Sequence, residues 1–175
     1  MWVAWPADWR AVRHVPNFDQ VNASVYRGGQ PGEPGLLELG AFGIKRIVDL
    51  RESGKATENE RTVLSKLGIK YINLPMSGFA APSEQQIEKA LAILNDEGPS
   101  PTFVHCRRGK DRTGTVIACY RIQHDHWSNQ QALNEAKEHG MGSWEWGMQG
   151  FISRFRTGAT ARLSPLSPPS LGTEH

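Results

Sequence analysis

Hydrophobic and polar positions follow one another along the chain in blocks that predict strands and helices by turns. Short, mostly apolar stretches rich in β-branched residues are typical of buried strands. These stretches cover residues 24–29, 44–50, 69–75 and 102–106. Longer stretches, in which apolar residues recur every three or four positions, predict helices between and after the strands. Because strands and helices alternate, we expect an α/β fold with a central, mostly parallel sheet flanked by helices.

Capping residues give the expected ends of the helices. A serine or threonine followed three positions later by glutamate or glutamine can form a capping box, and glycine often ends a helix. The predicted helices are 34–43, starting at Pro34; 57–68, with Thr57 and Glu60 as a capping box; 83–98, with Ser83 and Gln86 as a capping box; 112–127; and 128–140, with Ser128 as N-cap. Ligands of parallel sheets bind where strands end and helices begin, so we expect the functional residues at these positions.

Length and composition favour one globular domain. The chain has 175 residues, of which 38% are hydrophobic and 22% charged, and this allows a sizeable core. The formal net charge of +2 excludes the strongly basic balance that is typical of nucleic-acid-binding domains. We expect residues 1–17 to be a tryptophan-rich extension packed on the domain, residues 18–156 to be the domain, and residues 157–175 to be a flexible Pro/Ser-rich tail.

The number of cysteines and the hydropathy of the chain bear on where in the cell the protein is located. Two cysteines cannot make a disulfide framework, and their spacing fits no zinc pattern, which favours a reducing compartment. No apolar run approaches the ~20 residues that a membrane span requires, and the N-terminus does not read as a signal peptide. We therefore expect a cytoplasmic monomer without stable membrane insertion. Export after removal of a signal peptide is the alternative.

One stretch, FVHCRRGKDRTGTVIACY at 103–120, places a cysteine in unusual surroundings. Cys106 ends the last predicted strand, and four of the next six residues are basic. Those four are Arg107, Arg108, Lys110 and Arg112. The thiolate is the nucleophilic form of cysteine, and both a helix N-terminus and neighbouring cations stabilise it. We therefore predict that Cys106 is an activated nucleophile.

The residues after Cys106 have the chemistry of an anion cradle. Gly109 permits tight curvature, so that successive backbone N–H groups can form a concave nest for an oxyanion. The planar guanidinium of Arg112 can hold two phosphate oxygens at once. Thr113 can donate its hydroxyl to the sulfur when the sulfur has to leave. An anion cradle around a thiolate predicts phosphoryl transfer that needs no metal ion and no other cofactor.

The loop sequence HCRRGKDRTG resembles the His-Cys-x5-Arg-Thr loop of the cysteine-based protein tyrosine and dual-specificity phosphatases. Its GKDRTG part is similar to bacterial tyrosine/serine phosphatases, plant and fungal atypical dual-specificity phosphatases, and phosphatase-like phytases. VYRGGQP and GIKRIVDLRESG also resemble upstream segments of the bacterial enzymes, and the likeness extends from about Phe18 to Phe155.

This resemblance implies a protein tyrosine phosphatase-like fold, with the Cys-x5-Arg loop between a strand and a helix. It also implies that Cys106 is the nucleophile, that Arg112 binds phosphate, that Thr113 lies near the sulfur and that His105 orients the loop. The expected reaction is hydrolysis of phosphate monoesters through a phosphocysteine intermediate. A catalytically inactive phosphate-binding module that sequesters a phosphorylated partner is the alternative.

The source of the proton for the leaving group is open. Many members of the superfamily carry an aspartate about thirty residues before the cysteine, but no Asp or Glu occurs between Glu60 and Glu84 here. We favour Asp111, inside the loop, as the general acid over Glu84, at the start of its helix. A leaving group that needs little protonation, such as an aryl phosphate or a phosphoanhydride, is the third possibility.

The remaining loop residues bear on the substrate. The residues expected to bind it are Arg107, Arg108, Gly109, Lys110 and Gly114. Their charge exceeds what one phosphate monoester needs, which favours a polyanion such as an inositol phosphate or phosphoinositide. Alternatively, Arg107 and Arg108 point to solvent without binding substrate, and this interpretation explains their presence equally well. The expected partners are therefore a phosphorylated protein or a polyanionic small-molecule phosphate, and not nucleic acid.

Other residues whose side chains could bind a metal or react have simpler interpretations. Cys119 is expected in the core, within a helix. His124, His126 and His139 lack acidic or cysteine residues at ligand spacing, so solvated helix faces explain them better than a metal site. An internal ion pair explains Asp49 and Arg51 better than contact with a substrate.

Overall fold

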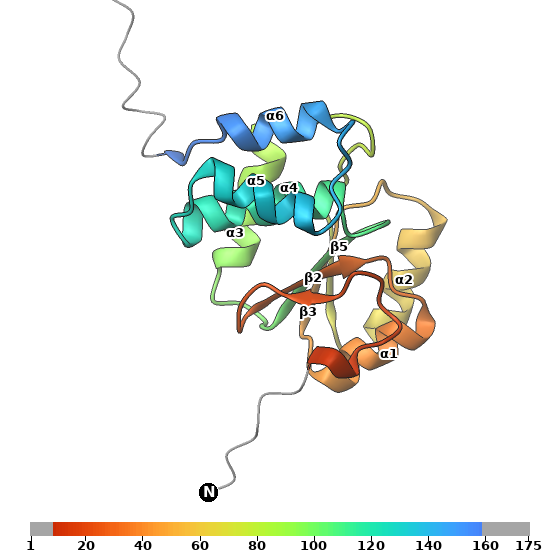
Figure 1. Cartoon of the computed structure of the whole chain (residues 1–175). Coiled ribbons are helices and arrows are strands. Elements are labelled where there is room, and N and C mark those ends of the chain that lie inside the picture. Colours follow the sequence, from red (N-terminus) through yellow and green to blue (C-terminus); the bar gives the residue numbers. More distant parts are fainter. Residues whose placement is uncertain (1–8, 159–175) are drawn as a thin grey trace, which may run out of the picture.

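The computed structural model describes residues 9–158, which form a mixed five-stranded sheet with helices on both faces (Figure 1). The strands are β1 (Asp19–Gln20), β2 (Val25–Gly29), β3 (Arg46–Asp49), β4 (Lys70–Asn73) and β5 (Thr102–Cys106). Their order in the sheet is β1-β2-β5-β3-β4, and each pairing is parallel except that of β1 with β2. The α/β prediction is confirmed, and β5 lies in the centre of the sheet.

Helices cover both faces of this sheet. They are α1 (Glu33–Phe42), α2 (Lys55–Lys66), α3 (Glu84–Asn95), α4 (Asp111–His124), α5 (Asn129–Glu138) and α6 (Trp146–Arg154), preceded by a 3-10 turn, η1 (Trp9–Ala11). Helices α1 and α2 lie on one face of the sheet, and α3 and α4 lie on the other (Figure 1). Helices α5 and α6 pack against α4 to form a further layer.

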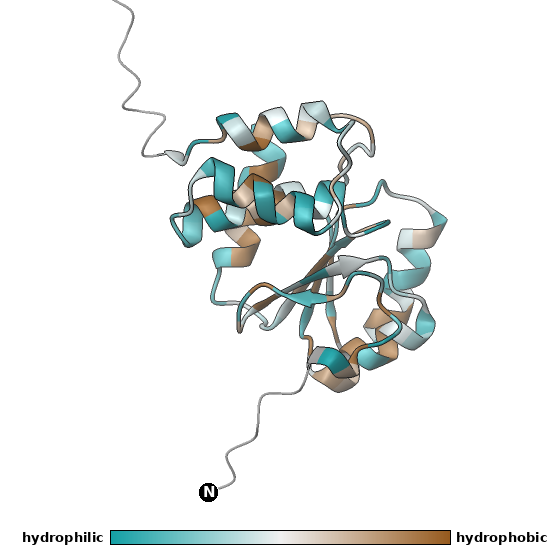
Figure 2. Cartoon of the chain, viewed as in Figure 1, coloured by the Kyte–Doolittle hydropathy of each residue, from teal (hydrophilic) through white to brown (hydrophobic). Residues whose placement is uncertain are grey.

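The strand β5 shows how alternation builds the two cores. Phe103 points to the α1–α2 face, whereas Val104 points to the α3–α4 face, and both are fully buried. Figure 2 shows hydrophobic residues along the central strands and within α1 and α3, while much of α2 is hydrophilic. Burial on both faces explains why the strand sequence is almost continuously apolar.

Of the two predicted capping boxes, that of Ser83 is present and that of Thr57 is wrong. Ser83 and Ser128 each accept a hydrogen bond from the backbone N–H three residues later, as expected. Helix α2, however, begins at Lys55 after Gly54, so Thr57 lies inside its first turn and bonds to Gly54. Glu60 is then one turn into the helix, and its side chain is buried instead of capping.

The end of helix α4 and the presence of helix α6 differ from the sequence prediction. Helix α4 ends at His124, three residues before the expected end, and His126 has a positive φ of 57°. Helix α6 was not predicted, because its nine residues include two glycines and bury only Met148 and Ile152. A short apolar pattern of this kind is a weak signal.

The chain before β1 is partly described. Val12 and Val15 are buried in the same cluster as α1, so this part of the N-terminal segment packs on the domain. The first eight residues of the tryptophan-rich extension and the predicted tail beyond residue 158 lie outside the described residues. Within the part of the chain that the structure describes, no helix is both long and apolar enough to cross a membrane.

Candidate active site

The four residues 107–110 connect the carboxyl end of β5 to the start of α4, at the edge of the sheet where ligands are expected. Cys106 is the last residue of β5 and is 2% exposed. The backbone N–H of Gly109 donates a hydrogen bond to its Sγ over 3.3 Å. The loop therefore curls around the sulfur, and the sulfur lies at the N-terminal end of α4.

Gly109 is required at this turn for two reasons. Its φ of +73° lies in the left-handed region that disfavours side chains, and a Cβ there would lie 2.3 Å from the carbonyl carbon of Gly28. Strand β2 therefore lies directly beneath the loop. Two more hydrogen bonds fix the loop from this side: Gln30 N–H donates to Arg107 O over 3.1 Å, and Asn17 Nδ2 donates to Arg108 O over 2.8 Å.

Arg112, in the first turn of α4, is held by backbone carbonyls of two other segments. Its Nη1 donates to the Met76 carbonyl over 3.2 Å and lies 3.5 Å from the Leu50 carbonyl. These carbonyls belong to the segments that follow β4 and β3, so the guanidinium is held between two neighbouring loops. Such anchoring orients the planar fork before any ligand arrives.

These residues line a cavity of about 650 Å³. Its lining residues are Arg51, Glu52, Gly78, Phe79, Cys106, Arg107, Arg108, Asp111 and Arg112. Four arginines and two acidic residues thus contribute to the lining around one buried thiol. Phe79, on the loop between β4 and α3, is 97% exposed at the rim of this cavity. The cavity has the size and charge to hold a polyanionic ligand.

Asp111 and Glu84, the two candidate acids, lie in different places. Asp111 lines the cavity, and each of its oxygens accepts a hydrogen bond: Oδ1 from Gly142 N–H over 3.0 Å, and Oδ2 from Arg108 Nη2 over 2.9 Å. Glu84 instead lines a separate hollow between α3 and α6. The geometry therefore places only the first of these two carboxylates at the cysteine.

Three of the expected loop residues take up other positions. Lys110 lines a separate hollow beside β1 and the end of α5, where its side chain lies against Gly140, so the expectation that it binds substrate is corrected. Gly114 faces Met141 and Ala136, and its role is close packing of α4 on α5. Thr113 Oγ1 is buried and has no hydrogen-bond partner among the described residues, so it is free to donate.

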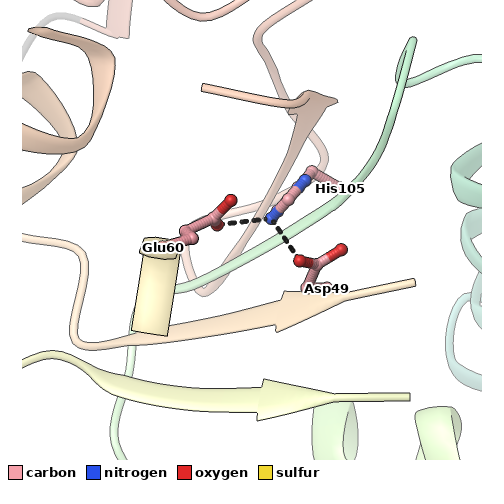
Figure 3. A group of neighbouring side chains, drawn as sticks. All are labelled: Asp49, Glu60 and His105. Carbon is pink, nitrogen blue, oxygen red and sulfur yellow. Dashed lines mark hydrogen bonds and ion pairs between the residues drawn. The ribbon is translucent and has the colours of Figure 1, made fainter. Parts of the chain in front are cut away.

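His105 belongs to a buried polar network on the α1–α2 face of the sheet (Figure 3). Its Nε2 lies 2.8 Å from Glu60 Oε1 and 3.9 Å from Asp49 Oδ2, while Nδ1 lies 3.3 Å from the Cys106 carbonyl. The Arg51 guanidinium bonds to both carboxylates, and the Tyr71 hydroxyl donates to Asp49 over 2.7 Å. The network thus connects β3, β4 and α2 to the strand residue that precedes Cys106.

Charge compensation explains how two acids are buried together. Burial by itself raises the pKa of Asp49, but hydrogen bonds from Arg51 and the nearby His105 lower it below its ordinary value. The preferred interpretation of Asp49 and Arg51 as an internal ion pair is therefore confirmed. Asp49, Glu60 and His105 are close enough to hold a metal ion, but the guanidinium of Arg51 already occupies both carboxylates. We assign to this cluster the role of supporting the loop that follows Cys106.

The other cysteine and the histidines are not part of this cavity. Cys119 is fully buried among apolar residues, and burial raises the pKa of its thiol. His124 is exposed and stacks on Tyr120, and His139 pairs with Asp19 over 2.8 Å. His139 is therefore half-buried and paired, and not simply solvated as expected.

Comparison with known proteins agrees with this geometry. A family model described as "DSP-PTPase phosphatase fused to NAD+ Kinase" matches residues 7–152. The chain therefore belongs to this family, whose catalytic module is a dual-specificity-type, protein tyrosine phosphatase-like domain. The core catalytic domain of the PP-IP phosphatase SIW14 from S. cerevisiae superposes with a TM-score of 0.75 at 29% identity, covering 87% of this chain and 93% of that one.

Two curated relatives represent different branches of the same class. The chain is 33% identical over 109 residues to inositol diphosphatase DSP2 of Oryza sativa, which covers 60% of the chain and 53% of the relative. It is 25% identical over 137 residues to the dual specificity protein phosphatase TpbA of Pseudomonas aeruginosa, which covers 78% of the chain and 61% of the relative. The chain spans only 11 to 61% of the first curated relatives that it matches.

Proposed function

We propose that the chain is a metal-independent cysteine phosphatase, with residues 18–156 as its catalytic domain. The observation that carries this proposal is the Gly109 N–H bonded to the buried Cys106 sulfur, inside a cavity lined by four arginines. The thiolate would attack phosphorus directly, because the arginines and backbone N–H groups supply the positive potential that a metal ion supplies in other phosphatases.

The reaction has two steps. In the first, Cys106 Sγ bonds to phosphorus while the bond from phosphorus to the leaving oxygen breaks, and that oxygen takes a proton. In the second, water attacks the phosphocysteine, phosphate is released and sulfur leaves as thiolate, to which Thr113 Oγ1 can donate a hydrogen bond. Arg112 would hold two equatorial oxygens throughout, because its guanidinium is anchored at the Met76 carbonyl and the residue lines the same cavity as Cys106.

Asp111 is the proposed proton donor and acceptor. Its carboxylate lines the cavity and accepts hydrogen bonds from Arg108 and from the Gly142 N–H. A bound phosphate dianion would compete for Arg108 and repel the carboxylate, so that protonation becomes easier when substrate is present. In the second step the same carboxylate would accept the proton that the attacking water loses.

We propose an inositol-phosphate-type polyanion as the substrate class, with phosphorylated proteins as the second class. Arg107 and Arg108 are exposed at the cavity mouth and can bind phosphates beyond the one that reacts. The names of two relatives, an inositol diphosphatase and a PP-IP phosphatase, support this choice. When a phosphoanhydride is cleaved, the leaving group is a phosphate oxygen that needs little protonation, which fits a chain that lacks the usual upstream aspartate.

Release of phosphate, measured with a metal chelator present, tests the proposal. An inositol pyrophosphate, a phosphotyrosyl peptide and p-nitrophenyl phosphate should all be hydrolysed. Arg107→Ala should impair the first substrate about tenfold more than the last, because it removes a charge that only a polyanion contacts. Lys66→Ala, at the exposed end of α2, is the control and should change neither. Binding of the pyrophosphate without any release would favour the sequestering module instead.

A further inference from the structure

A buried arginine lies beneath the catalytic loop with few partners. Arg27, on β2, is 1% exposed, and its Nη2 donates to the Gly109 carbonyl over 3.3 Å. Its Nε and Nη1 have no hydrogen-bond partner among the described residues. Burying an incompletely paired cation is costly, so the position needs a reason.

The acids near Arg27 do not supply that reason, because other residues already hold them. Glu135 accepts a hydrogen bond from Arg121 over 2.7 Å, and Asp19 lies 2.8 Å from His139 Nε2. Burial lowers the pKa of Arg27 to about 10, while the charges of Glu135, Asp19 and Cys106 act in the opposite direction. Arg27 therefore stays protonated at neutral pH, and part of its charge is left uncompensated.

One glycine connects this cation to the nucleophile. The Gly109 N–H donates to Cys106 Sγ, and the Gly109 carbonyl accepts from Arg27. We propose that Arg27 is a positioning residue, which fixes Gly109 against the sulfur and stabilises the thiolate and the bound phosphate from the buried side of the loop. The part about phosphate rests on the proposed function, whereas the part about the thiolate does not.

The other charges around these groups come from different directions. Those that face Cys106 are Arg51 and Glu52 after β3, and Arg107, Arg108, Asp111 and Arg112 of the loop and α4, with His105 next to it on β5. Those that act on Arg27 are Asp19 of β1, Arg121 of α4 and Glu135 of α5. Arg107 and Arg108 are exposed to solvent and substrate, whereas Arg27 is buried and screened by neither. Its effect on the thiolate should therefore persist at high salt.

The test is the pH dependence of iodoacetamide alkylation at Cys106, followed by mass spectrometry, with Cys119 as internal reference. Arg27→Met should move the alkylation midpoint upward by about one pH unit, which means about tenfold slower labelling below the midpoint. Arg27→Lys keeps a buried cation and should stay close to the parent midpoint. It should nevertheless lower phosphatase turnover, because the shorter side chain loses the Gly109 carbonyl.

Arg46→Met is the matched control. Arg46 is also a buried arginine of the sheet, 2% exposed, but it bonds to Thr102 and Asp96 at the opposite ends of the strands. This variant should lose stability without shifting the midpoint. If Arg27→Met does not fold, the neutral Arg27→Gln should give the same upward shift. An unchanged midpoint in a folded neutral variant, or equal upward shifts from Arg27→Met and Arg46→Met, would overturn the inference. Alkylation needs no turnover, so this result is independent of whether the chain proves to be a phosphatase.

Discussion

Cys106 and Cys119 are both buried, free thiols, yet their surroundings differ in every other respect. Cys119 lies within α4 among apolar side chains, and burial alone raises the pKa of its thiol. Cys106 ends the strand that precedes the same helix, and its sulfur accepts a hydrogen bond from the Gly109 N–H in the cavity that the arginines line. Burial in apolar surroundings suppresses a thiolate, whereas burial in a cradle of donors and cations can stabilise it. The comparison predicts opposite behaviour for the two cysteines.

Replacing each cysteine by serine should give the largest contrast. Cys106→Ser should abolish turnover, because a serine hydroxyl in this cradle is a far weaker nucleophile than a thiolate. Cys119→Ser should keep turnover near the parent level and lower stability by roughly 1–3 kcal/mol, because it buries a hydroxyl without a partner. Steady-state assays and urea unfolding measure the two effects. Equal losses of activity in both variants would remove the distinction.

Asp111→Asn should lower the rate on alkyl phosphates by ~10²–10⁴. The loss should be much smaller on p-nitrophenyl phosphate, whose leaving group needs little protonation. Rates across a series of leaving groups measure this difference, because damage to the loop would slow every substrate alike. Glu84→Gln is the control and should be near neutral, since its carboxylate lies outside the cavity. A leaving-group-dependent loss in Glu84→Gln would reassign the acid.

Gly109→Ala tests whether the cradle depends on its close approach to β2. The new Cβ would lie 2.3 Å from the Gly28 carbonyl carbon, so the loop must move and turnover should fall by about 10². Gly68→Ala is the matched control, because Gly68 has a similar φ of +68° but no atom within 4 Å of the added Cβ. This control should lose about 1 kcal/mol of stability from backbone strain and keep full activity.

The smallest expected effect is the pH dependence of stability caused by Cys119. Its folded-state pKa is raised above the unfolded value of ~8.5, so above this pH the unfolded chain ionises while the folded chain keeps its proton. The free energy of unfolding should therefore fall with rising pH, by up to about 1.4 kcal/mol per pH unit. Urea unfolding at mildly alkaline pH measures this slope. In Cys119→Ala the slope should be shallower, and an unchanged slope would show that other groups cause it.

Local patterns made part of the site predictable. Cys106, Arg112 and Thr113 belong to one short segment that runs from the end of a strand to the start of a helix. Their proximity therefore follows from their closeness in the sequence. Helices α3 and α5 were predictable for the same reason, because serine caps act over three residues.

The supports of the loop come from distant segments, and no local pattern gives their positions. Arg27 lies on another strand, and the Gly142 N–H that bonds to Asp111 lies beyond α5. Glu60 was misread because its spacing from Thr57 matches a capping box, whereas tertiary contacts with Arg51 and His105 decide its position. The glycine pair after Arg27 could have indicated that another segment packs closely on this strand, since adjacent glycines in a strand indicate close approach of another backbone.

The central claim is that Cys106 carries the phosphoryl group between the two steps. Rapid acid quench during turnover, followed by peptide mass spectrometry, tests it most directly. The account predicts a phosphate adduct on the peptide that contains Cys106, absent from the peptide that contains Cys119. Phosphate on any other residue, or turnover that persists in Cys106→Ser, would contradict it.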